Sequence, residues 1–234
     1  MALCLFAGLG FWQVQRLHWK HDLIARVDAR IHATPVDMPS PDRLQNVDTT
    51  TFEYLRVEAT GTYRAEASAL VRAATELGTG YWAMTPMDTD QGETLWINRG
   101  FLPAGTGLST ARASVPLGKV TVIGLLRPSE PDGSLLQANR PADDRWYSRD
   151  VMALSDARAV QESVLPVFVD AQSERLTASA PARATPAGPK PVPGLTVVNF
   201  PDNHLGYAIT WFALALMSAG AIVLVWRRAG RRAE

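Results

Sequence analysis

The side chains with the clearest chemical potential in this sequence are its four histidines, His18, His21, His32 and His204. Imidazole is the group that most often binds transition metals and exchanges protons near neutral pH. His18 and His21 are three positions apart, so on a helix both can face the same way. If their helix stands beside one that begins near His204, three imidazoles share one depth and could ligate a metal ion or a haem iron noncovalently. The alternative is that His18 and His21 only face lipid headgroups.

Other common kinds of site are missing from the sequence. The one cysteine, Cys4, lies in an apolar run, so neither an intramolecular disulfide nor a thiolate pair for a metal can form. There is no Cys-x-x-Cys-His haem attachment motif, nucleophile elbow, phosphate-binding glycine loop or zinc-binding His-Glu motif. With 23 basic and 23 acidic residues and no long basic stripe, the charge pattern is not that of a nucleic-acid-binding protein. We therefore expect neither an enzyme nor a nucleic-acid partner.

A long apolar stretch must position His204. Leu205–Trp226 contains no charged residue, and its length of about 22 residues makes a helix of about 33 Å, enough to cross a hydrocarbon core of about 30 Å. The tail 227–234 follows with four arginines, which mark the cytoplasmic side. A transmembrane helix over 204–226 therefore places His204 at the outer edge of the bilayer, where an ionisable residue is a candidate for function.

One face of this helix carries small residues below the histidine. At 100° per residue, His204, Ala208, Trp211, Ala215 and Ala219 share that face. Small residues let a second helix approach closely. They would equally leave room for a flat macrocycle attached to the imidazole, and the sequence does not separate these two uses.

An apolar segment also opens the sequence. Residues 1–16 are expected to form a first transmembrane helix, which continues over 17–34 as a juxtamembrane helix with apolar residues at helical spacing. Trp12 stands where aromatic side chains anchor helices at the interface. A signal peptide is the other interpretation, but a basic start and a small-residue cleavage site are missing. Two spans put both termini in the cytoplasm, with the C-terminal arginines outweighing Arg16 and Lys20 on the outer face.

The middle of the chain, 35–200, has the pattern of an extracytoplasmic β-rich domain. Short β-prone runs are separated by glycine and proline clusters, which favours a small antiparallel barrel or sandwich. One helix is expected from Asp150 to about Ser163, and the Ala/Pro-rich stretch 178–194 is expected to be an extended loop. The fold class is thus a membrane α+β protein with two transmembrane helices flanking this domain. The expected strands are 55–62, 69–72, 81–87, 94–101, 120–126, 167–170 and 195–200.

Three arginines, Arg140, Arg145 and Arg149, surround Trp146 and Tyr147. Guanidinium groups bind carboxylates well, so a cluster near the membrane could take haem propionates or acidic partner loops. A solvated polar face is the alternative.

Four segments together resemble the Surfeit locus protein 1 family of cytochrome c oxidase assembly factors. They extend over nearly the whole chain, in the order that the family has. The segments are Gly8–Arg16 with Lys20 and Leu23–Ile24, Ile97–Phe101, Trp146–Asp150 and Asn203–Trp211.

The resemblance implies a protein of the bacterial inner (plasma) membrane that binds haem a transiently and helps insert it into the catalytic subunit of the oxidase. Haem a synthase and membrane lipid are further implied partners. The family's proposed haem contact corresponds to His204, which would ligate the iron, while Trp211 and Trp12 would pack on the macrocycle and Tyr207 would hydrogen-bond its edge. Two positions depart from the family. The family usually has Asn where this chain has Asp202, and it often has Gln where this chain has Gly206.

Two other functions stay open. A cofactor-free scaffold would dock its helices on the oxidase subunit through the small-residue face and stabilise an assembly intermediate. A membrane-tethered enzyme would require a catalytic constellation that the sequence does not display.

Overall fold

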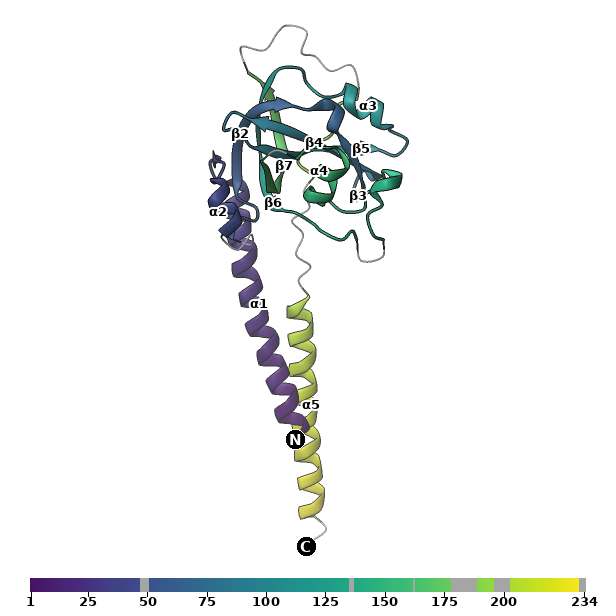
Figure 1. Ribbon diagram of the computed structural model, residues 1–234. Helices are drawn as coiled ribbons and strands as arrows, with labels where there is room; N and C mark the ends of the chain where they lie inside the picture. The colour runs from purple at the N-terminus through teal and green to yellow at the C-terminus, as the bar shows by residue number, and fades with distance from the viewer. Residues whose placement is uncertain (47–50, 135–136, 162, 178–188, 196–202, 232–234) are drawn as a thin grey trace. The chain divides into compact units, whose positions relative to one another are not determined.

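The structure is a computed structural model of residues 1–234, and it describes 1–46, 51–134, 137–161, 163–177, 189–195 and 203–231 (Figure 1). The chain divides into two compact units. One contains Met1–Ala29 with Val198–Glu234, and the other contains Arg30–Val197. Each unit has its own secondary structure, a helix pair in the first and a β-rich domain in the second.

The helices are α1 (Ala2–His32), α2 (Pro41–Asn46), α3 (Leu108–Ala113), α4 (Val151–Ala157) and α5 (His204–Gly230), with short 3-10 turns η2 (Ala65–Ala67) and η3 (Pro141–Asp143). The strands are β1 (Val36–Asp37), β2 (Arg56–Tyr63), β3 (Ala69–Thr75), β4 (Gly78–Thr89), β5 (Thr94–Pro103), β6 (Lys119–Pro128) and β7 (Val164–Leu176). Six of the seven expected strands are confirmed as β2 to β7; the seventh, 195–200, lies outside the described residues except for Leu195.

Five of the strands close into a barrel (Figure 1). The ring runs β2, β6, β7, β5, β4 and returns to β2, because the second half of β2 pairs with β4 as well as with β6. The ring pairs are antiparallel except β5 with β7, and β1 is also parallel to β2. The predicted antiparallel pairing is therefore wrong at these two pairs, while the β-rich domain itself is confirmed. Closure leaves the ring strands without an open edge along their paired lengths.

Alternating side chains on the ring strands fill the barrel. Val57, Ile97, Val122 and Val169 come from four different strands and belong to one buried cluster. The intervening residues of β5 and β7 point outward, where Trp96 and Phe168 pack with Leu154 of α4 in a second cluster. Nearly all of β5 is consequently buried, including the polar side chains of Asn98 and Arg99.

The helix after Asp150 is shorter than its sequence predicts. Asp150 caps it, since its carboxylate accepts a hydrogen bond from Ala153 N at 3.1 Å. The helix ends at Ala157, and Ala159 has a left-handed φ of 52° that cannot continue it. The predicted extension to Ser163 is therefore wrong, because the chain turns there and enters β7.

The helix pair consists of α1, continuous from Ala2 to His32, and α5. Of the helices in the described part of the chain, one is long and apolar enough to cross a membrane, His204–Arg228, with a mean hydropathy of 2.2. This finding agrees with the predicted span over 204–226. The first span over 1–16 stays a prediction, because the apolar part of α1 is short and a charged residue, Arg16, follows it.

Gly100 lies where the segment 189–195 contacts strand β5 of the barrel. It has a φ of +125°, and Phe101 N and Val192 N each donate to the other residue's carbonyl at 2.9 Å. A Cβ at Gly100 would stand 2.3 Å from Val192 O. The segment 189–195 can therefore lie against β5 only if residue 100 has no side chain.

We expect Gly100→Ala to lower the free energy of unfolding by about 2–5 kcal/mol, since backbone strain and a steric clash add. Gly92→Ala is the matched control: Gly92 also has a positive φ, +95°, but nothing lies within 4 Å of its would-be Cβ. That variant should lose only about 1 kcal/mol. Urea unfolding of the full chain in detergent, followed by tryptophan fluorescence, measures both. Equal losses would show that the contact with Val192 contributes nothing.

Candidate functional site

The helices α1 and α5 meet along small and buried side chains. Gly10 of α1 is buried, and a Cβ there would stand 2.7 Å from the ring of Phe212 of α5. Ala208 and Ala215 of α5 are buried as well. Two aromatic pairs join the helices, Phe6 with Trp211 at 5.9 Å and Phe11 with Phe212 at 5.4 Å. Of the two uses considered for the small face of α5, close helix packing is the one that this structure displays at Ala208 and Ala215.

A polar contact bridges the helices at the start of α5. His204 is the first residue of α5 and is half-buried. Its ring Nδ1 lies 2.8 Å from Oε1 of Gln13, a side chain of α1 that is only 8% exposed. An amide oxygen can only accept, so Nδ1 donates the hydrogen and the lone pair of the neutral ring is at Nε2. Gln13 is not among the site residues predicted from the sequence, although it is the one polar side chain in the apolar run Ala2–Val14.

The other predicted contact residues are arranged differently. Trp211 lies on the same face of α5 as His204, as expected. Its ring, however, stacks on Phe6 at an interplanar angle of 24°. Tyr207 and Trp12 are both exposed over more than half of their surface. The structure thus brings His204 together with Gln13 and Trp211 with Phe6, and the roles of Tyr207 and Trp12 stay predictions.

The cluster of three imidazoles, one of the two alternatives that the sequence leaves open, does not form among the described residues. His18 and His21 are exposed, and His18 Nδ1 donates to Val14 O of its own helix at 2.9 Å. Within the residues that the structure describes, no three histidine, cysteine or acidic side chains are grouped so that they could hold a metal ion. A metal-binding role would therefore depend on His204 without the help of the other imidazoles.

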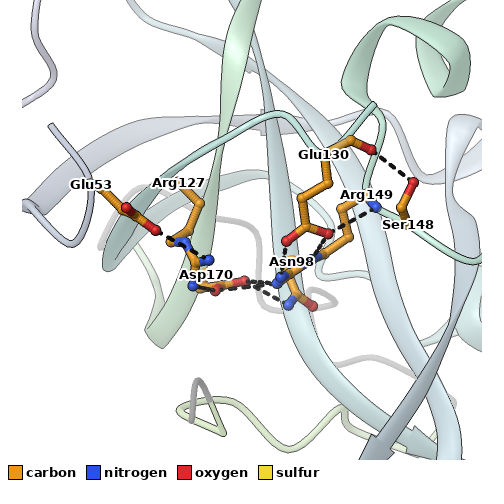
Figure 2. Close-up of polar contacts among 7 residues, drawn as sticks. All are labelled: Glu53, Asn98, Arg127, Glu130, Ser148, Arg149 and Asp170. Atoms are coloured by element: carbon orange, nitrogen blue, oxygen red, sulfur yellow. Dashed lines mark hydrogen bonds and ion pairs between the residues drawn. The ribbon is translucent and has the colours of Figure 1, made fainter. Parts of the chain in front are cut away.

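A second polar centre lies in the β-rich domain, around Asp170 of β7 (Figure 2). This carboxylate is only 2% exposed. Asn98 of β5 donates its Nδ2 to it at 2.7 Å, and Arg149 donates Nη1 at 2.9 Å. Arg127 of β6 forms an ion pair with it at 3.7 Å. The centre therefore joins three neighbouring strands of the ring to the segment that precedes α4.

The arginines of this centre also hold two further carboxylates. Arg149 donates to Glu130 at 3.0 Å and Arg127 pairs with Glu53 at 3.5 Å (Figure 2). Burial by itself would lower the pKa of Arg149, but the charge of Asp170 and the bonds to Glu130 outweigh it and raise that pKa. Burial would raise the pKa of Glu130, but Arg149 outweighs it and lowers that pKa. Both groups are therefore held in their charged forms.

This arrangement changes the interpretation of the predicted arginine cluster. Arg149 is engaged by carboxylates of its own domain, whereas Arg140 and Arg145 are exposed and joined by backbone hydrogen bonds. A cavity of about 230 Å³ lies beside the centre, with Tyr54, Trp82 and Asp170 in its wall. The geometry indicates a structural ion-pair network beside a small cavity, and it gives Arg149 no surplus charge for a propionate.

A third group of buried polar side chains lies within the barrel domain. Arg99 of β5 is 2% exposed and donates Nε to Glu174 of β7 at 2.9 Å. Tyr63 of β2 donates its hydroxyl to the same carboxylate at 2.7 Å. Burial, reinforced by the charge of Glu174, raises the pKa of Tyr63 well above its usual value.

Tyr63 should make the fold sensitive to alkali. Its pKa is near 10 in the unfolded chain and higher in the folded one, so its contribution to stability is present below about pH 10 and is lost as the pH rises further. We expect Tyr63→Phe to lower stability at pH 7 by about 1 kcal/mol but to lose less stability than the parent between about pH 9 and 11. Urea unfolding at several pH values measures this slope. Tyr81→Phe is the control, and a parallel slope in Tyr63→Phe would contradict the prediction.

Comparison of the sequence with known proteins identifies a family and several relatives. The sequence model of the SURF1 family matches residues 1–216. The chain is 30% identical to a SURF1-like protein of Monosiga brevicollis over 238 residues, covering 96% of this chain and 85% of that protein. It is 32% identical to Surfeit locus protein 1 of Rattus norvegicus over 225 residues, covering 88% and 67%. The corresponding human protein is 30% identical over 229 residues, covering 89% and 69%.

Proposed function

The chain belongs to the SURF1 family, whose members are non-enzymatic assembly factors of cytochrome c oxidase, and from this premise we propose that it carries haem a to the oxidase. Haem a is in this proposal a transient cargo, bound noncovalently at the outer end of the helix pair. The protein would release it to the catalytic subunit of the oxidase.

The bond between Gln13 and His204 is the observation that carries this proposal. It fixes an imidazole at the first turn of an apolar helix with the lone pair at Nε2, the nitrogen that would ligate haem iron. When haem is bound, its iron would supply the affinity for the imidazole. Trp211 and Trp12 would pack on the macrocycle, and Tyr207, which is exposed, could reach its edge. One protein ligand fits a carrier, since transfer requires release.

The proposal includes a cellular location and a membrane topology. Two spans, 1–16 and 204–226, would anchor the chain in the inner (plasma) membrane of a bacterium, with both termini cytoplasmic. The juxtamembrane helix 17–34 and the domain 35–200, including its loop 178–194, would be extracytoplasmic, and the tail 227–234 cytoplasmic. Four arginines in that tail support this orientation under the positive-inside rule. Haem a synthase is a further proposed partner, because it would supply the cargo.

The absorption spectrum of the purified full chain tests the proposal. We expect a Soret band when the host makes haem a and no haem a bands when haem a synthesis is deleted. A colourless protein from the competent host would overturn the carrier function.

A cofactor-free scaffold is the second candidate, and the helix packing favours it. Ala208 and Ala215 are buried and Trp211 stacks on Phe6, so the face that could hold a macrocycle is in large part occupied by α1. A colourless preparation that still copurifies with the catalytic subunit of the oxidase would support this function instead.

A further inference from the structure

We propose that Gln13 is a positioning residue for His204, and that its side-chain carbonyl sets the tautomer and the direction of the imidazole. The part that concerns haem affinity rests on the proposed function above. The part that concerns the ring itself does not, because the bond is made within the protein.

The position of Gln13 limits what its side chain can do. It is 8% exposed on a helix whose neighbouring residues are mostly apolar, so its amide needs a partner inside the protein. His204 Nδ1 supplies one at 2.8 Å, across 191 positions of sequence. The contact therefore joins α1 to α5 directly.

Close packing next to this contact, on α1 and on α5, keeps the two groups in register. One turn before Gln13, the absence of a side chain at Gly10 lets the Phe212 ring approach. One turn after His204, Ala208 is only 3% exposed. Neither helix can rotate far without opening these contacts, so the amide oxygen and Nδ1 stay aligned.

The direction of the hydrogen bond has a chemical consequence. Because Oε1 accepts, the Nδ1–H tautomer is selected and the lone pair is assigned to Nε2. An acceptor on Nδ1–H also makes the opposite nitrogen a stronger electron donor, as the outer partners of metal-bound histidines commonly do. A residue that merely tied the helices together would have neither effect.

The tautomer can be measured without any cargo. The full chain, with isotope-labelled histidine, is purified in detergent from a host that lacks haem a synthesis, and nitrogen–proton correlation spectra are recorded at about pH 8.5, where imidazole is neutral. His204→Ala assigns the signal. We expect the Nδ1–H tautomer in the parent, loss of this preference in Gln13→Met, and its retention in Gln13→Glu, which keeps an acceptor. Gln15→Met, an exposed glutamine of the same helix, should resemble the parent.

The second measurement titrates the parent, Gln13→Met, Gln13→Glu and Gln15→Met with haem a extracted from an oxidase. We expect Gln13→Met to bind about 10–100-fold more weakly than the parent. Gln13→Glu should bind with near-parental affinity or better, and Gln15→Met with parental affinity.

The two measurements separate the possible failures. An Nε2–H tautomer in the parent, or an unchanged tautomer in Gln13→Met, would overturn the positioning role. A parent with the expected tautomer that binds no haem a would overturn the carrier function and leave the positioning of His204 intact. Equal haem a affinity of Gln13→Met and the parent would show that the positioned ring is not the ligand.

Discussion

Replacing Asp170 with alanine is expected to lower the free energy of unfolding by about 3–5 kcal/mol. The carboxylate is 2% exposed and lies against both Arg127 and Arg149. Its removal leaves two largely buried guanidinium groups with less negative charge around them, and Asn98 loses the acceptor of its amide at 2.7 Å. Urea unfolding of the full chain in detergent, followed by tryptophan fluorescence, measures the loss.

The control is an ion pair on the surface. Asp90 pairs with Lys119 at 2.8 Å, and the two side chains are 49% and 45% exposed. Asp90→Ala should therefore lose less than about 1 kcal/mol. If Asp170→Ala were as mild as this control, the ion-pair network of Figure 2 would not be what holds β5, β6 and β7 to the segment before α4.

His204→Ala is expected to remove the Soret band of the protein purified from a host that makes haem a. Loss of an outer hydrogen-bond partner weakens metal binding by about 10–100-fold, and loss of the ligand itself should weaken it more. The band per mole of protein, measured in detergent, is the readout. The variant should keep its helix content, because position 204 is at the end of α5.

Two other histidines provide matched controls. His18 and His21 are exposed on α1, and His18 bonds to the backbone of its own helix. His18→Ala and His21→Ala should keep the parental band. An unchanged band in His204→Ala would place the ligand elsewhere in the protein, and loss of the band in His18→Ala or His21→Ala would point to the imidazole cluster that the structure does not form.

Local structure was more predictable from the sequence than long-range strand pairing. Runs such as 120–126 are apolar and β-branched, so their strands were predictable from composition and flanking turns. The parallel pairing of β5 with β7 was not, because it joins Trp96 to Phe168 and no local pattern encodes the partner. The end of α4 was also missed, because no glycine or proline marks the left-handed turn at Ala159.

The candidate site was predictable only in part. A histidine beside an apolar span was evident, and the structure places His204 at the start of α5. Its partner Gln13 is distant in sequence, and nothing local predicts that the two helices face each other at these positions. The centre at Asp170 was missed for the same reason, because its arginines come from separate segments.

The order of strands in the barrel has a consequence for biosynthesis. The last strand in the described part of the chain, β7, lies between β5 and β6, so the ring cannot close until residue 176 has been made. Until then both neighbours expose unpaired backbone groups, and contacts between residues so distant in sequence form slowly. The nascent domain therefore passes through an open, aggregation-prone state, and a chain truncated before β7 should be degraded rather than accumulate as a smaller folded protein.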